Sequence, residues 1–131
     1  MVPIILHVEL KLYLTIQNGQ DNTAIGSAAL VGNTTGNFNT AIGRHALYEN
    51  TQGTSNTACG VDALEDNTTG DYNTAIGDAA LANNITGNRN CASGLWALNG
   101  NTSGSYNTSS GYFALRANTT GVYRSAFRTV P

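Results

Sequence analysis

Apolar and polar residues recur along this chain with a period of 17 residues, from about residue 20 to about residue 123. In each period a short apolar segment such as 40–42 is followed by a glycine, then by an Ala-Leu pair, and then by an asparagine and a second glycine. A fixed period of this size is typical of repeat architectures. Because each apolar segment is short and is stopped by glycine, it predicts a strand of three or four residues that ends in a turn.

Several places in the repeat hold the same residue in all six copies, and among them a leucine row and two asparagine rows are predicted to lie inside the fold rather than on its surface. The leucine row comprises Leu30, Leu47, Leu64, Leu81, Leu98 and Leu115, each preceded by alanine. The first asparagine row comprises Asn22, Asn39, Asn56, Asn73, Asn90 and Asn107. The second asparagine row comprises Asn33, Asn50, Asn67, Asn84, Asn101 and Asn118.

The two asparagine rows predict ladders of side-chain hydrogen bonds. An asparagine in a tight turn can bond the nearby backbone and also its own copy in the next coil, which satisfies polar groups that would otherwise be buried without partners. We also expect Asn50 and Gly53, and their copies, to supply the left-handed or tight backbone of the corners.

These elements predict an all-β fold, a parallel β-solenoid of about six 17-residue coils over residues 20–123. Like residues of successive coils should lie about 4.8 Å apart. A helical repeat is excluded, because two glycines in every unit would each cost about 1 kcal/mol relative to alanine. Residues 124–131 depart from the pattern and are expected to form a C-terminal cap or a truncated linker.

The N-terminal segment follows a different pattern. Between residues 8 and 16, apolar residues alternate with polar ones, which predicts one half-buried strand. Terminal units of a solenoid are expected to be atypical. We therefore interpret residues 1–19 as an N-terminal capping strand, or as a strand shared with a partner chain.

The predicted core is small, and this favours assembly with other chains. Each coil offers about one isoleucine, one leucine and two alanines, and each large side chain contributes about 1.5–3 kcal/mol. Ordering each residue costs about 1–2 kcal/mol, so a second buried face would add much stability. Strand alternation puts the alanines of the strands and the Ile25 row on opposite faces, and either face could meet the partner chains.

The repeat unit resembles two related groups of proteins. Its matching residues are Asn22-Thr23-Ala24-Ile25-Gly26, Asn39-Thr40-Ala41-Ile42-Gly43 and Asn73-Thr74-Ala75-Ile76-Gly77, each followed by an Ala-Leu pair. They are similar to the YadA-like head repeats of trimeric autotransporter adhesins and to the NTAIG repeats of phage tail-fibre-type surface proteins. This unit is longer than the adhesin head repeat, so we expect an expanded corner.

The resemblance implies a left-handed parallel β-roll, a homotrimer, and a place on the cell outer surface or the virion. It also implies a cell-adhesion role, namely attachment to a host receptor, a matrix protein or a glycan. A structural segment of a phage tail fibre is the alternative. Candidate contact residues occupy variable, outward places of the repeat; they are Arg44, His45, Tyr48, Leu95, Trp96, Tyr112 and Phe113.

The charge and the lengths of the apolar runs argue against binding to nucleic acid or to a membrane. The net charge is −2, and no basic patch for nucleic acid or polybasic segment for a membrane surface is present in the sequence. No run approaches the roughly 18 apolar residues that span a bilayer. We therefore expect no nucleic-acid partner and no direct membrane contact.

The sequence also predicts no enzyme, no cofactor and no metal site. Its clustered carboxylates lie at variable places of the repeat and are interpreted as a solvated acidic patch; they are Asp62, Glu65, Asp66, Asp71 and Asp78. His45 stands alone in its row and is interpreted as a surface residue. Cys59 and Cys91 lie about two coils apart, beyond disulfide reach, and are expected to be small buried or half-buried thiols.

One further hypothesis belongs to a different class. Threonine pairs at 34–35, 68–69 and 119–120 share one phase of the repeat, as a regular ice-binding face would require. The row is interrupted at Gln52 and Ile85, which weakens this hypothesis.

Overall fold

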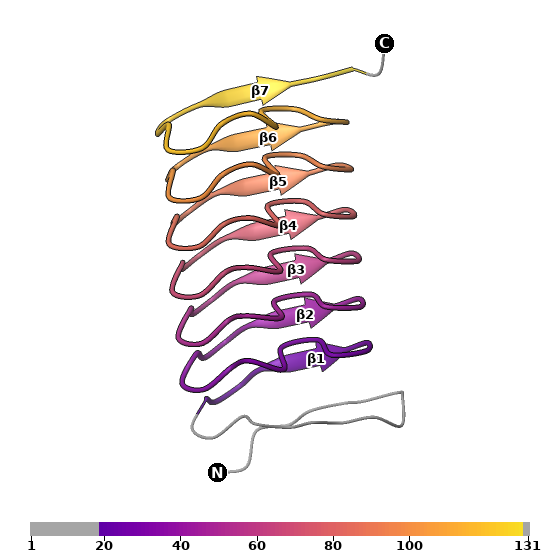
Figure 1. The fold of residues 1–131 in the computed structure, drawn as a ribbon, viewed down its shortest axis with the longest axis vertical. Coiled ribbons are helices and arrows are strands. Elements are labelled where there is room, and N and C mark those ends of the chain that lie inside the picture. The colour runs from indigo at the N-terminus through magenta and orange to yellow at the C-terminus, as the bar shows by residue number, and fades with distance from the viewer. Residues whose placement is uncertain (1–18, 130–131) are drawn as a thin grey trace.

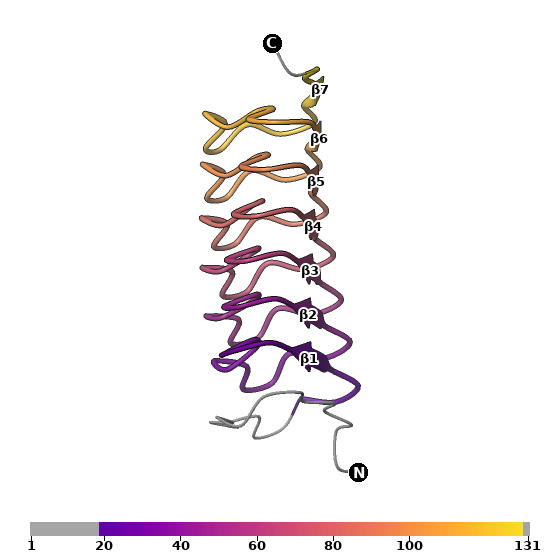
Figure 2. The ribbon, with the colours of Figure 1, turned by 90° about the vertical axis from the view of Figure 1, so that its right-hand side faces the viewer.

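A computed structural model describes residues 19–129, which form a parallel β-solenoid of about six turns, as the period predicted (Figure 1). Within these residues, seven strands make a single sheet in sequence order. The strands are β1 (Thr23–Ile25), β2 (Thr40–Ile42), β3 (Thr57–Cys59), β4 (Thr74–Ile76), β5 (Cys91–Ser93), β6 (Thr108–Ser110) and β7 (Ser125–Phe127). Figure 2 shows the sheet along one side of the stack and the loops on the other.

The register of the sheet is one repeat per strand. Thr23 pairs with Thr40, and Thr40 pairs with Thr57, so like residues lie beside one another along the stack. The loops continue this pairing outside the strands: the Leu47 amide, for example, donates to the carbonyl of Ala63 at 3.0 Å. Each coil is thus held by hydrogen bonds to the coils on either side, in addition to turn bonds within the coil such as that from the Asn50 amide to the carbonyl of Leu47 at 3.2 Å.

The core is a narrow column of alanine and leucine. Strand alternation turns the middle residue of each strand inward, and the leucine row packs against it from the loop side. Ala41, Ala58, Leu47 and Leu64 are fully buried. The first and third residues of each strand therefore point outward, which answers the question that alternation alone left open: the alanine row faces the chain's own core and the Ile25 row does not.

Left-handed backbone occurs at places that the sequence analysis did not expect. Asn50 and Gly53 are not in this conformation; the non-glycine residues that adopt it in this coil are His45 (φ 56°), Leu47 (φ 53°) and Ser55 (φ 59°). A left-handed L-residue costs about 1–2 kcal/mol. The buried side chain of Leu47 and its bond to the next coil must offset that cost, so the coil-to-coil packing imposes the conformation.

The second glycine of the repeat is required for space rather than for its backbone angle. A Cβ atom on Gly53 would collide with the Asn50 side chain and with the carbonyl oxygen of Gly70. The first glycine is different, since Gly43 has φ 130°, a conformation that side-chain-bearing residues rarely adopt.

The asparagines act through their side chains. The Asn67 amide nitrogen donates to Oδ1 of Asn50 at 2.8 Å and to the carbonyl of Gly70 at 3.0 Å. In the other row, the backbone amide of Asn73 donates to Oδ1 of Asn56 at 2.9 Å. These amides are fully buried, so the two ladders satisfy the corners from inside the coil.

The sequence predicted special elements at both ends of the solenoid. The strand predicted between residues 8 and 16 lies outside the described residues. At the other end, β7 falls within the segment 124–131 that was expected to be a cap or linker, and it pairs with β6 in the register of the repeat, Thr108 with Ser125. None of the residues described here belongs to a helix long and apolar enough to cross a membrane.

Candidate functional site on the solenoid surface

The outward residues of β1–β7 form a flat surface, which we call the sheet face. One row holds the first residue of each strand, mostly threonine; the other holds Ile25, Ile42, Cys59, Ile76, Ser93, Ser110 and Phe127. Ile42 is 40% exposed and Ile76 is 48% exposed, which is high for large aliphatic side chains. The sheet face therefore combines apolar and hydroxyl side chains with no charged group.

A second set of side chains precedes the strands, and we call it the tyrosine row; its members are Tyr72, Arg89, Tyr106 and Tyr123, one from each of four successive coils. The Arg89 guanidinium lies 5.2 Å from the ring centroid of Tyr72 and 5.5 Å from that of Tyr106. Tyr106 and Tyr123 stack with their centroids 4.9 Å apart. Sequence analysis did not select these residues as contact candidates, although their shared phase in the repeat was a readable signal.

A third set follows the strands near the C-terminal end, and we call it the tryptophan cluster. The rings of Trp96 and Phe113 stack at 5.8 Å, and the edge of Tyr112 meets Phe113 at 4.1 Å. The Arg116 guanidinium lies 4.9 Å from the Trp96 centroid and 4.6 Å from that of Phe113. Three of the predicted contact residues are thus brought together here, with Arg116 as a member that sequence analysis missed.

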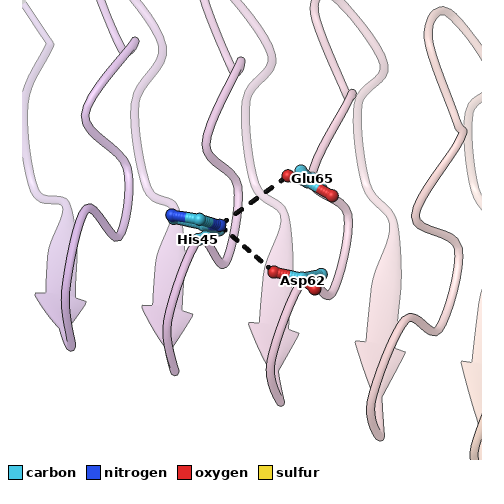
Figure 3. A group of neighbouring side chains, drawn as sticks. All are labelled: His45, Asp62 and Glu65. Carbon is cyan, nitrogen blue, oxygen red and sulfur yellow. Dashed lines mark ion pairs between the residues drawn. The ribbon is translucent and has the colours of Figure 1, made fainter.

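The predicted contact residues Arg44, His45 and Tyr48 lie about three coils or more away from that cluster. Here His45 meets two carboxylates (Figure 3): its Nδ1 is 3.3 Å from Oδ1 of Asp62 and 3.8 Å from Oε1 of Glu65. The His45 ring also packs against the ring of Tyr48, with centroids 5.1 Å apart. His45 is therefore not an isolated surface residue.

The electrostatics of this group are unbalanced. Arg44 contacts the other oxygen of Asp62, with 3.5 Å between Nη2 and Oδ2. Oδ1 of Asp62 is buried and accepts no hydrogen bond. Partial burial, and then repulsion from Asp62 and Asp66, raises the pKa of Glu65 above its usual value. The group holds more negative charge than its neighbours neutralise.

Two of the remaining carboxylates of the predicted acidic patch bond to a neighbouring coil. Oδ1 of Asp71 accepts from the Thr54 amide at 2.7 Å, and Oδ1 of Asp78 accepts from the Val61 amide at 3.3 Å. Both therefore take part in hydrogen bonding between coils.

The two cysteines lie on the sheet face. Cys59 and Cys91 are free, and both are exposed, which corrects the expectation of buried or half-buried thiols. Each occupies an outward strand position, so its side chain points away from the alanine column.

Comparison with known proteins identifies no relative: no family model, no curated protein and no solved structure matches this chain.

Proposed function

We propose that this chain is a non-enzymatic, head-like segment of a surface attachment protein. In this proposal three copies of a left-handed coil stand side by side as a homotrimer on the outer surface of a bacterial cell or a virion. The sheet face holds the copies together, and the aromatic sets outside it contact a host receptor, a matrix protein or a glycan. The observation that carries the proposal is the exposed, uncharged sheet face over a core that is only alanine and leucine.

Assembly through the sheet face follows from the cost of leaving it in water. Ile42 and Ile76 lie on strands that are flat and regularly spaced, so a like surface can pack against them over several coils. Burying an isoleucine side chain contributes about 1.5–3 kcal/mol. A homotrimer would give each thin chain the second apolar contact that its own core does not provide.

Attachment through the aromatic sets is supported by their composition. Tyrosine, tryptophan and arginine are the residues most often found at the energetic centres of binding surfaces. In the tryptophan cluster they are stacked in advance, so little rotamer freedom remains to be lost when a ligand binds. Three copies would present the same surface several times, which raises avidity without new contacts.

A binding assay tests the attachment role. The purified chain is measured against cultured host cells, immobilised matrix proteins and an array of glycans, together with Trp96→Ala and the control Phe38→Ala. Phe38 is also an exposed aromatic residue, 60% exposed, but belongs to a coil far from the cluster. We expect Trp96→Ala to weaken binding at least about tenfold, the effect of losing about 1.4 kcal/mol, and Phe38→Ala to leave it unchanged.

The same assay separates this proposal from the alternative of a tail-fibre structural segment. A trimer that binds none of the three kinds of target would contradict attachment and favour a purely structural role. The ice-binding hypothesis gains no support, because the hydroxyls of its threonine row donate to carbonyls of the next coil: Thr34 to Thr51 at 2.7 Å and Thr68 to Ile85 at 3.1 Å.

A further inference from the structure

We infer that His45, Asp62 and Glu65 form a binding site for a divalent transition-metal ion, with Zn²⁺ as the best match, bridging two successive coils. The inference is independent of the proposed function. Each residue offers one donor atom, and the three donor atoms lie within 4.8 Å of one another. Figure 3 shows the imidazole from one coil facing both carboxylates of the next.

The period of the solenoid creates this arrangement. His45 and Asp62 occupy the same place in successive coils, and both have φ 56°, so their side chains leave the backbone in the same direction. Coil-to-coil bonds hold both backbones, since the amide of Asp62 donates to the carbonyl of Arg44 at 2.9 Å. Glu65 follows Asp62 by three residues, and its carbonyl accepts from Glu49 at 2.8 Å. The donor atoms are thus carried by a rigid frame.

The distances suit a small ion. Zn²⁺ binds imidazole nitrogen and carboxylate oxygen at about 2.0–2.2 Å, so neighbouring donors around a tetrahedral ion lie about 3.3–3.6 Å apart. The separation of Nδ1 and Oδ1 is 3.3 Å, and that of Nδ1 and Oε1 is 3.8 Å. The three donor atoms lie within 4.8 Å of one another, so the Glu65 side chain, which is 35% exposed, would rotate toward the other two donors to reach the tetrahedral spacing.

The buried oxygen of Asp62 is placed as a ligand of a cation would be. Oδ1 lies at hydrogen-bonding distance from His45 Nδ1, yet it accepts no hydrogen bond from it or from any other described group. Two ligand atoms of one tetrahedral ion also lie close together without a hydrogen bond between them, because the lone pair of each ligand atom is directed at the ion and not at the other ligand atom. Arg44 contacts Oδ2 of the same carboxylate, which leaves Oδ1 for the ion.

The donor types select the class of metal. An imidazole favours Zn²⁺ and its neighbours over Mg²⁺ and Ca²⁺, which prefer oxygen ligands alone. The three side chains are about one-third exposed, so water can supply a fourth ligand. Tyr48 packs against the imidazole and restricts the orientation of the ring.

Titration of the purified full chain with ZnCl₂ by calorimetry tests the inference. We expect one ion per chain, with Zn²⁺ preferred over Mg²⁺ and Ca²⁺. Replacement of Zn²⁺ by Co²⁺ should give the visible absorption of a four-coordinate site. His45→Gln and Glu65→Gln should each weaken Zn²⁺ binding at least about tenfold, because each removes one of three protein ligands.

Two matched variants separate coordination from general attraction. Asp66→Asn removes the same charge as Glu65→Gln at the adjacent residue, and His7→Gln removes the chain's other histidine. Both should bind Zn²⁺ as the unaltered chain does, and circular dichroism checks that every variant is folded. The inference is overturned if folded chain binds no Zn²⁺, if Mg²⁺ or Ca²⁺ is preferred, or if Asp66→Asn weakens binding as much as Glu65→Gln.

Discussion

Asn39 and Asn50 donate to the same acceptor, the carbonyl oxygen of Gly53, at 2.7 and 3.0 Å. They belong to the two different asparagine rows, so one backbone oxygen joins both ladders in each coil. The next coil repeats the arrangement, with Asn56 and Asn67 on Gly70 at 2.8 and 3.0 Å. The ladders are therefore one connected network, in which the loss of any amide leaves several buried groups without partners.

Asn67→Ala should destabilise the chain more than most polar substitutions. It removes two donated bonds, to Asn50 and Gly70, and one accepted bond from Asn84 at 2.7 Å. We expect the free energy of unfolding to fall by about 2–4 kcal/mol, because buried partners are left unsatisfied. Denaturant unfolding followed by circular dichroism measures it. The control Asn83→Ala, at an exposed position, should change it by less than about 1 kcal/mol; equal effects would contradict the network.

The leucine row should be the least tolerant part of the core. Leu64 is fully buried, so Leu64→Ala should cost about 2–5 kcal/mol and Leu64→Asp should abolish folding. Leu95 is 42% exposed, so Leu95→Ala should cost well under half as much. Thermal melts of the three variants check this. Similar losses for Leu64→Ala and Leu95→Ala would mean that the inside and outside of the coil are reversed.

Replacement by glycine should have opposite effects on the stability of the chain at two adjacent alanines, Ala79 and Ala80. Ala79 has φ 52°, a conformation that glycine adopts without steric cost, so Ala79→Gly should raise the free energy of unfolding by up to about 1 kcal/mol. Ala80 is fully buried, so Ala80→Gly should lower that free energy by roughly 1 kcal/mol or more. A loss of stability in Ala79→Gly would contradict the left-handed backbone at that place.

The thiols of Cys59 and Cys91 should report on the sheet face. Both are exposed on a single chain, so a monomer would react with a thiol reagent nearly as fast as the unfolded chain does. If the sheet faces pack together, as proposed, the reaction should slow at least about tenfold, because exposure sets the access of the reagent. The reaction rate is compared between native and denatured protein. Equal rates would mean that the sheet face is exposed to solvent and would contradict its packing against other chains.

The sequence predicted the coil length, the strands and the parallel stacking, because a period of 17 fixes which residues lie beside one another. It could not show which strand face points inward, because alternation places Ala41 and Ile42 on opposite faces without saying which of them meets the leucine row. It also missed the left-handed backbone at Leu47, because leucine carries no signal for that conformation. The contact of His45 with Asp62 could be read from their separation of one repeat. The cluster occurs in only one pair of coils, however, so the repeat pattern gave no signal that marked it as a site.

The central functional claim is that three chains meet through their sheet faces, and the mass of the purified chain in solution tests it most directly. Light scattering on the protein as it elutes from a size-exclusion column should give three times the 13.7 kDa mass of one chain, at concentrations down to the micromolar range. A folded chain that elutes at 13.7 kDa at every concentration would contradict the claim.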